Sequence, residues 1–184
     1  DFEAEHAPML TLVMGMAACM AIEKITGLTA EIKWPNDVVI NKKKTTGILT
    51  EMGMSEGKIS YVVVGIGINL NMESFPEELA YKATSLKIEC GHEINRDEIA
   101  AALLFYFEQY YEKFEQTHNL GFLIEEYNNH LVNRGKEVLI KEKDGEYTGI
   151  SRGINDKGEL LVEKKDGNCV EIFSGEVSVR GLYG

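Results

Sequence analysis

KWPNDVVINKKKTTGIL, residues 33–49, places two short apolar runs on either side of three consecutive lysines, with a glycine at the start of the second run. Short runs bounded by turn-forming residues are typical of strands. Including the flanking residues, we expect strands at 30–33, 38–41, 47–53 and 59–68. Their connections are shorter than the roughly dozen residues that a parallel crossover needs, so an antiparallel meander is predicted.

A long apolar segment precedes this sheet. Residues 8–26 are predicted to form a helix, because Pro8 suits a first turn and Gly27 suits a terminator. The helix is apolar on nearly all sides, so we expect it to be buried against one face of the sheet. A membrane span would need about 20 apolar residues. This run ends earlier, at Glu23 and Lys24, so no membrane association is predicted.

The rest of the chain changes in character. Residues 71–91 form a long connection of the kind that is often functional. A second helix is expected after Asn95, which forms a capping-box pattern with Glu98, and a third at about 122–131. Past residue 132, pairs such as Asp-Gly separate short alternating strands, which predicts a small barrel or sandwich. The predicted class is therefore α+β, with a mostly antiparallel sheet flanked by helices and followed by this small β module.

Composition argues against several function classes. The formal net charge is -11, so general binding to nucleic acid or to a membrane surface, which relies on neutralising phosphates, is not expected. The three cysteines, Cys19, Cys90 and Cys169, lie far apart without a CxxC pair. This suits a reducing cytoplasm and argues against a disulfide framework or a thiolate zinc site. The four histidines lack the HExxH spacing, so no metal site is predicted.

The window from residue 33 to 44 holds four lysines and one aspartate, a local surplus of three positive charges in an acidic chain. Such a cluster raises the local concentration of an anionic ligand. Charge runs are most often solvated hairpin tips, and that interpretation stays open, above all for Lys42 and Lys43. Lys44 differs because it leads into the next strand, which gives its side chain a fixed base from which to reach a phosphate oxygen.

The WPND turn offers polar groups beside the lysines. Asn36 can donate and accept through one carboxamide, which suits a purine edge or a ribose. Asp37 either closes the turn through its own backbone or serves the site, and the sequence does not separate these alternatives. We interpret Trp34 as a core residue rather than a stacking platform.

The run GIGIN at residues 65–69 begins like a dinucleotide-binding fingerprint, but Leu70 replaces the third glycine and no helix follows. Its glycines would still admit a flat ligand close to the backbone, with Asn69 at the mouth. A glycine kink in a curved sheet is the alternative. No Ser-His-Asp order or paired-carboxylate motif is recognisable. The residues suit catalysis by positioning and charge neutralisation. Phosphoryl and adenylyl transfer are catalysed in this way, usually with Mg²⁺ carried in by the nucleotide.

Four motifs together resemble those of the biotin protein ligases. They are KWPND at 33–37, KxxGILxE at 44–51, GIGIN at 65–69 and SGEVSVR at 174–180, in this order and at matching spacing. The resemblance implies a mixed sheet flanked by helices, distantly like class II synthetases, over residues 1–132. An SH3-like barrel over residues 133–184 would follow. It also implies a two-step enzyme that forms biotinyl-5′-adenylate from biotin and ATP and then transfers biotin to a lysine of an acceptor protein.

The resemblance also assigns roles to residues. It implies Lys44 as the catalytic residue, beside the activated carboxylate and the phosphate. The expected biotin-binding residues are Lys44, Gly47, Ile48, Leu49, Gly65 and Gly67. The expected ATP or adenylate-binding residues are Lys33, Asn36, Asp37, Asn69 and Arg180. Biotin, ATP and Mg²⁺ are implied as substrates or ligands, without a tightly bound prosthetic group and without a metal site built from protein residues.

As partners, the resemblance implies a biotin carboxyl carrier protein and allows a homodimer, and it places the protein in the cytoplasm. The sequence departs from the family in lacking the Gly-Arg-Gly-Arg loop, because its four arginines are scattered, and in lacking the helix-turn-helix of repressor-type members. We therefore expect weak biotin binding and poor ligation by these residues alone, and no nucleic-acid binding. Two alternatives stay open: a non-catalytic docking or dimerisation module, and a lipoate ligase-like acyltransferase.

Overall fold

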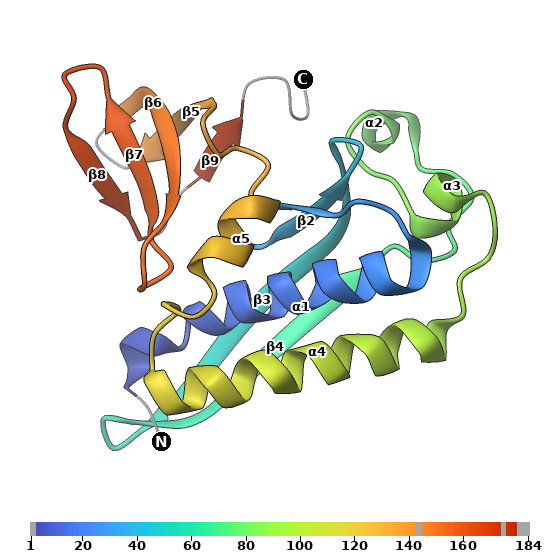
Figure 1. Cartoon of the computed structure of the whole chain (residues 1–184), viewed down its shortest axis with the longest axis horizontal. Coiled ribbons are helices and arrows are strands. Elements are labelled where there is room, and N and C mark those ends of the chain that lie inside the picture. Colours follow the sequence, from blue (N-terminus) through green and yellow to red (C-terminus); the bar gives the residue numbers. More distant parts are fainter. Residues whose placement is uncertain (1–2, 143–144, 174–175, 180–184) are drawn as a thin grey trace.

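The computed structural model describes residues 3–142, 145–173 and 176–179. Its first half contains a four-stranded antiparallel sheet in the order β1-β2-β3-β4 (Figure 1). The strands are β1 (Glu31–Lys33), β2 (Asp37–Ile40), β3 (Lys43–Ser55) and β4 (Lys58–Ile68). Consecutive strands are neighbours throughout, so the predicted antiparallel meander is confirmed.

β3 is longer than the sequence indicates, because it begins at Lys43 and not after the lysine run. Thr45 and Thr46 extend the strand; both are β-branched, as strands favour, and both are buried. Of the three consecutive lysines, only Lys42, with a φ of 65°, lies in the turn between β2 and β3. Lys44 is therefore anchored within the sheet and does not belong to a hairpin tip.

α1 (Met9–Thr26) covers one face of this sheet, as predicted, and α4 (Arg96–Thr117) packs along it (Figure 1). Gly27 ends α1 in the left-handed conformation, with a φ of 71°. A Cβ atom on Gly15 would lie 3.6 Å from Ile48 Cδ1, an ordinary van der Waals distance, so α1 packs against β3 at this point without requiring glycine. α1 has the length and hydropathy of a membrane span, but the sheet and α4 bury most of it, which accounts for its apolar composition.

The remaining helices partly match expectation. The connection from β4 to α4 is not a plain loop, because it contains α2 (Glu77–Ala80) and α3 (Leu86–Cys90). The predicted N-cap of α4 is confirmed: Asn95 Oδ1 accepts a hydrogen bond of 2.9 Å from the backbone N–H of Asp97. The predicted third helix is α5 (Ile124–His130), and a short 3₁₀ helix, η1 (Ala4–His6), precedes α1.

The described C-terminal residues form a five-stranded antiparallel sheet in the order β8-β7-β6-β5-β9 (Figure 1). The strands are β5 (Glu137–Glu142), β6 (Gly145–Ile154), β7 (Leu160–Lys164), β8 (Cys169–Ile172) and β9 (Glu176–Val179). Gly158 and Gly167, with φ of 79° and 85°, occupy turns that the sequence predicts. The α+β class and the small β module are thus confirmed, and closure into an SH3-like barrel stays a prediction.

The two sheets share one hydrophobic core. The indole N–H of Trp34 donates to the carbonyl of Gly158 at 3.0 Å. On α5, Asn128 Oδ1 accepts a 2.9 Å hydrogen bond from the N–H of Ile154. The C-terminal sheet therefore gains part of its burial from the first half of the chain. A sheet of this size buries only a thin core by itself. A domain boundary at residue 132 stays a prediction.

Replacing Gly158 tests this shared core. A Cβ atom there would lie 2.9 Å from Leu12 Cδ2 and 3.1 Å from Leu120 Cδ1, in a residue whose φ is positive. Gly167 is a matched control, because its φ is also positive but a Cβ atom there meets no described atom within 4 Å. We expect Gly167→Ala to lower the unfolding free energy by about 1 kcal/mol and Gly158→Ala by about 2–4 kcal/mol. Urea denaturation measures both, and equal losses would show that the modules do not pack as described.

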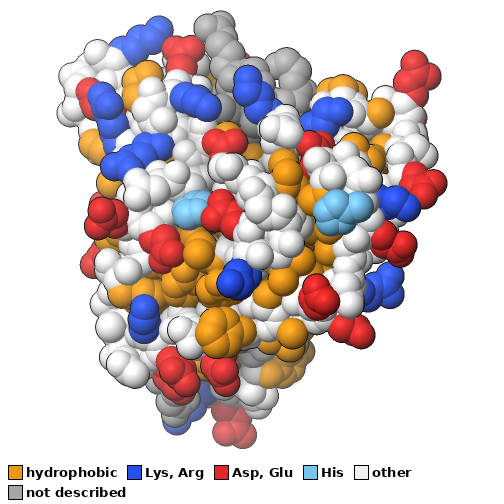
Figure 2. Space-filling model, turned by 45° about the vertical axis from the view of Figure 1, so that its right-hand side comes forward, with side chains coloured by type: hydrophobic (Ala, Val, Ile, Leu, Met, Phe, Trp, Pro, Cys, Tyr) orange, Lys and Arg blue, Asp and Glu red, His pale blue; other side chains and the backbone are white. Residues whose placement is uncertain are grey.

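Apolar side chains remain exposed on the long β3–β4 hairpin and on α4. Figure 2 shows a band of hydrophobic side chains across one side of the molecule, between acidic and basic ones. The exposed large apolar residues of the hairpin are Leu49, Met52, Met54, Tyr61 and Val63, and those of α4 are Leu104 and Phe105. Contiguous apolar surface usually marks a place where a ligand or another protein surface packs.

Candidate functional site

One row of residues crosses all four strands of the first sheet. Lys33 pairs with Asp37, Asp37 with Gly47, and Gly47 with Gly67. Directly opposed residues in antiparallel strands point to the same face. Ile48, the residue after Gly47, is turned towards α1, so these four residues lie on the other face. We call them the cross-strand row, and it unites four residues that the sequence assigned separately to biotin or to ATP.

Lys44 joins this row because β3 contains a bulge. The register between β2 and β3 shifts where Val38 pairs with Thr46 and Val39 with Lys44, so Thr45 is the extra residue. Thr45 and Thr46 are both buried, which shows that two successive side chains point into the core. A bulge of this kind re-aims the next side chain. It turns Lys44 away from α1 and onto the face of the row.

The ammonium group of Lys44 forms a short ion pair with Asp37 Oδ1. The Asp37 side chain is 12% exposed, whereas the Lys44 side chain is 41% exposed and can still meet a ligand. The carboxylate of Asp37 faces Lys44 from the first position of β2, and a role of Asp37 in binding the adenylate stays a prediction. A buried carboxylate that has one cationic partner fixes where that cation sits.

Gly47 has a steric role beside this pair. A Cβ atom on Gly47 would lie 3.2 Å from both Cε and Nζ of Lys44. The missing side chain therefore makes room for Lys44 to fold back towards Asp37. The resemblance implies contact between Gly47 and biotin, and the structure adds this contact with the lysine side chain.

Gly65 and Gly67 on β4 leave open space on the same face. Gly65 pairs with Leu49, whose side chain is 64% exposed. Among the described residues, a Cβ atom on Gly67 would meet nothing within 4 Å, and one on Gly65 would meet only the Leu49 carbonyl oxygen at 3.7 Å. Neither glycine has a positive φ. Packing within the described residues therefore does not require glycine at these positions, and contact of Gly65 and Gly67 with a ligand stays a prediction.

Two expected polar residues hold the site together through backbone contacts. Asn36 Nδ2 donates to the carbonyl of Ile48 at 3.0 Å, so the WPND turn is fastened to β3. Asn69 donates from its backbone N–H to the carbonyl of Thr45 at 2.8 Å and from Nδ2 to the carbonyl of Thr84 at 3.1 Å. Both amides are thus ordered next to the row, and each carboxamide keeps its oxygen as an acceptor.

Other expected residues fall elsewhere. The side chain of Ile48 is buried against α1, so only its backbone is available on the face of the row. Trp34 is 2% exposed, which confirms it as a core residue. Lys42 is exposed as expected, whereas Lys43 Nζ donates to the carbonyl of Ala80 at 3.0 Å. Arg180 lies outside the described residues.

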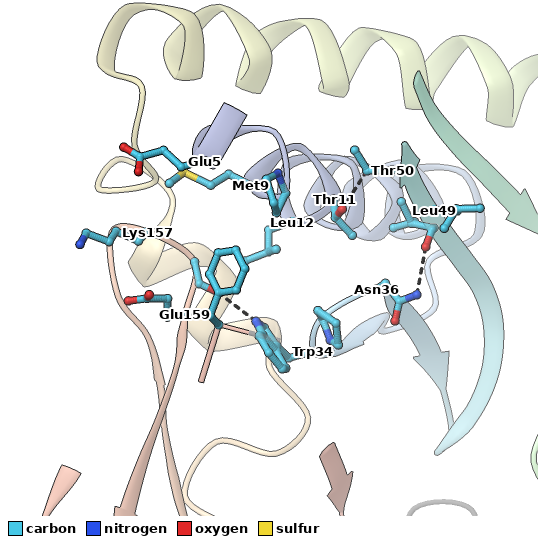
Figure 3. Close-up of a pocket in the computed structure, with 15 residues that line it drawn as sticks. Glu5, Met9, Thr11, Leu12, Trp34, Asn36, Leu49, Thr50, Lys157 and Glu159 are labelled. Atoms are coloured by element: carbon cyan, nitrogen blue, oxygen red, sulfur yellow. Dashed lines mark hydrogen bonds between the residues drawn. The ribbon is translucent and has the colours of Figure 1, made fainter. Parts of the chain in front are cut away.

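Sequence reasoning missed a cavity of about 320 Å³ at the junction of the two modules (Figure 3). The start of α1, the WPND turn, β3 and residues 157–159 contribute its walls. Thr11 donates to Thr50 across it at 2.8 Å, and Asn36 lines it as well. With Phe173, the walls come from five segments that are distant in the sequence, so no local sequence pattern predicts such a site.

Thiol and metal chemistry find little support in the described residues. Burial, with Glu23 and Glu31 nearby, raises the pKa of Cys19 well above its usual value, and burial also raises the pKa of Cys90. Both thiols are therefore poor nucleophiles. Within the described part of the chain, no three His, Cys, Asp or Glu residues gather as a metal site would require.

Two family models match this sequence. The model of the biotin/lipoate A/B protein ligase family matches residues 1–69, and the model of the biotin protein ligase C-terminal domain matches residues 135–180. The first match covers α1 and the whole first sheet, including the site. The two matches thus place the fold among those of the biotin and lipoate protein ligases.

Individual relatives narrow this class. The biotin protein ligase from Aquifex aeolicus, solved in complex with biotin and ATP, superimposes with a TM-score of 0.82 at 34% identity, covering 94% of this chain and 71% of that one. The chain belongs to the biotin protein ligase family. The bifunctional ligase/repressor BirA of Bacillus spizizenii is 36% identical over 97% of this chain and 55% of its own length. The biotin–[acetyl-CoA-carboxylase] ligase of Paracoccus denitrificans is 29% identical over 92% and 74%. The chain thus spans about half the length of the BirA relative.

Proposed function

We propose that this chain carries the biotin and adenylate site of an ATP-dependent biotin protein ligase. The observation that supports this most is the ammonium group of Lys44, held by Asp37 above a row of glycines on an open sheet face. A cation fixed beside open space suits a ligand that combines a carboxylate and a phosphate with a flat ring. The Aquifex relative, which binds biotin and ATP, supports the same assignment.

In the first step, the carboxylate of biotin would attack the α-phosphorus of ATP. A carboxylate–phosphorus bond forms, the bond to the β-phosphate oxygen breaks, and pyrophosphate leaves. Negative charge builds up on the non-bridging oxygens of the α-phosphate. Lys44 is placed to neutralise this charge, and its pairing with Asp37 fixes the ammonium group before the substrates arrive.

In the second step, the amine of an acceptor lysine would attack the carbonyl carbon of biotinyl-5′-adenylate. An amide bond forms, the acyl–phosphate bond breaks, and AMP leaves while the amine loses a proton. The leaving phosphate carries the negative charge, so Lys44 stabilises this step as well. One cation in one position thus serves both reactions.

The two halves of the intermediate would occupy neighbouring parts of the sheet. The ring of biotin fits over Gly65 and Gly67, where the structure leaves space beside the exposed Leu49. Asn36 and Asn69 offer carboxamide oxygens to the adenylate, with Lys33 and Arg180 as expected sources of positive charge. Mg²⁺ would enter with the phosphates of the nucleotide.

The acceptor is a biotin carboxyl carrier protein in this proposal. Its support is the name of the Paracoccus relative, which acts on acetyl-CoA carboxylase. A cytoplasmic location and a homodimer stay predictions. The match of residues 135–180 to a module described for biotin protein ligases favours biotin over lipoate as the acid.

Isothermal titration calorimetry tests this function directly. We expect a non-hydrolysable biotinyl-adenylate analogue to bind with micromolar or tighter affinity, and the matching lipoyl analogue to bind far more weakly. The reverse preference would move the chain to the lipoate ligases. Absence of heat at millimolar concentrations of both ligands would overturn the proposal and favour a docking module.

A further inference from the structure

Residues 82–89, which we call the strap, extend the first sheet beyond the end of β4. The backbone N–H of Lys44 donates to the carbonyl of Lys82 at 2.8 Å, and the N–H of Thr84 donates to the carbonyl of Lys44 at 2.9 Å. Lys44 and Ala83 form a parallel bridge. The backbone of Lys44 is therefore held by the strap on one side and by β2 on the other.

Thr84 in the strap also holds Asn69. Its carbonyl accepts the 3.1 Å hydrogen bond from Asn69 Nδ2, and Leu86 N–H donates to the carbonyl of Asn69 at 2.9 Å. Thr84 is buried, with 1% of its surface exposed. A single buried residue thus binds Lys44 through its N–H and Asn69 through its carbonyl. In the proposed function, Lys44 serves the phosphate and Asn69 the adenylate.

Glu89 on α3 fixes the side chain of Thr84. Thr84 Oγ1 donates to Glu89 Oε1 at 2.5 Å, and Asn41 Nδ2 donates to Glu89 Oε2 at 2.6 Å. Asn41 lies in the turn between β2 and β3, with a φ of 49°. One carboxylate therefore ties the strap to the hairpin that carries Lys44, through hydrogen bonds to a charged acceptor, which are the stronger kind.

We propose that Glu89 is a positioning residue of the ligase: through Thr84 it sets the distance between Lys44 and Asn69. This inference rests on the proposed function, because it concerns how the same site is aligned. Catalysis by positioning tolerates little displacement of the groups that surround the reacting atoms. Glu89 itself touches neither ligand in this proposal and acts only through Thr84 and Asn41.

The chain offers conservative and control variants for the test. In Glu89→Gln the amide oxygen can accept from Asn41, while the amide N–H can donate to the hydroxyl of Thr84, which also accepts. Glu89→Ala removes both contacts. Glu73→Ala is the matched control, because it removes the 2.7 Å ion pair between Glu73 and Lys87, which also fastens α3 but does not involve Thr84.

Two measurements on the whole chain test the proposal. We expect Glu89→Ala to weaken binding of the biotinyl-adenylate analogue about tenfold, because the hydrogen bond that holds Thr84, and through it Lys44 and Asn69, is lost. We expect Glu89→Gln and Glu73→Ala to bind like the parent. Without ligand, amide hydrogen exchange at Lys44 and Thr84 should become about tenfold faster in Glu89→Ala and stay unchanged in the other two variants.

The outcomes separate this inference from the proposed function. Unchanged exchange at Lys44 and Thr84 in Glu89→Ala would overturn the positioning role, whatever the ligand does. Equal losses of binding in Glu89→Ala and Glu73→Ala would also overturn it, because α3 would then act as a whole. A parent chain that fails to bind the analogue overturns the proposed function instead, even where exchange at Lys44 still responds to Glu89.

Discussion

Replacing Lys44 by alanine is expected to weaken binding of the biotinyl-adenylate analogue about 100-fold, because truncating one partner of a close charge pair costs several kcal/mol. The phosphate would lose its cation, and the carboxylate of Asp37 would repel it instead. Titration calorimetry measures the affinity. The thermal stability of the variant must be measured as well, because Lys44→Ala also removes the ion pair with Asp37.

Two further variants make this result specific. Lys42→Ala removes an exposed lysine from the neighbouring turn, so we expect parent-like affinity. Asp37→Asn combined with Lys44→Ala removes the unpaired carboxylate and should recover stability without recovering the affinity of the parent. Equal affinities for Lys44→Ala and Lys42→Ala would mean that only the total charge of the lysine run matters.

Gly67→Val is expected to reduce binding of the same analogue by a similar factor, about 100-fold, by displacing the ring of biotin. No described atom lies within 4 Å of a Cβ atom at this position, and valine is favourable in strands. We therefore expect the unfolding free energy to change by less than about 0.5 kcal/mol. A large loss of affinity without a loss of stability would locate the ligand over this glycine.

Val63→Phe is the control for Gly67→Val. Val63 lies on β4 and is also exposed, and the two-residue period of a strand places it on the same face, four positions from Gly67. The Val63→Phe substitution adds bulk to the sheet away from the cross-strand row, so we expect little change in the affinity for the analogue. If Gly67→Val bound the analogue like the parent, biotin would have to bind elsewhere, and the cavity between the modules would become the next candidate.

Much of the fold could be predicted because its signals are local. Pro8 and Gly27 mark the ends of α1, and both ends lie within a residue of the expected positions. The short turns around Asn36 and Gly57 are enough to exclude parallel crossovers, and β1 to β4 all pair antiparallel. Turn residues and hydrophobic periodicity involve only a few neighbouring positions, so they can be recognised in a single sequence.

The bulge at Thr45 could not be predicted, although it decides the direction of Lys44. Two adjacent threonines look polar, and nothing in their neighbours indicates that both side chains enter the core. Their burial follows from pairing with β2 and from packing under α1, and neither is a local property. Sequence reasoning therefore singled out Lys44 but placed it before the strand, because it set the start of β3 too late.

Contacts between distant segments were out of reach for the same reason. The partner of Asp37 lies on the next strand, so its ion pair with Lys44 depends on the register of β2 and β3. Glu89 and Thr84 read as ordinary surface residues of a long connection. Their importance depends on where the strap crosses β3, which only the folded chain shows.

A crystal structure of the chain with the bound biotinyl-adenylate analogue tests the central claim most directly. We expect the phosphate within hydrogen-bond distance of Lys44 Nζ, the ring of biotin over Gly65 and Gly67, and the adenosine towards Asn36 and Asn69. A ligand seated in the cavity at the junction of the two modules, with Lys44 still bound only to Asp37, would contradict it.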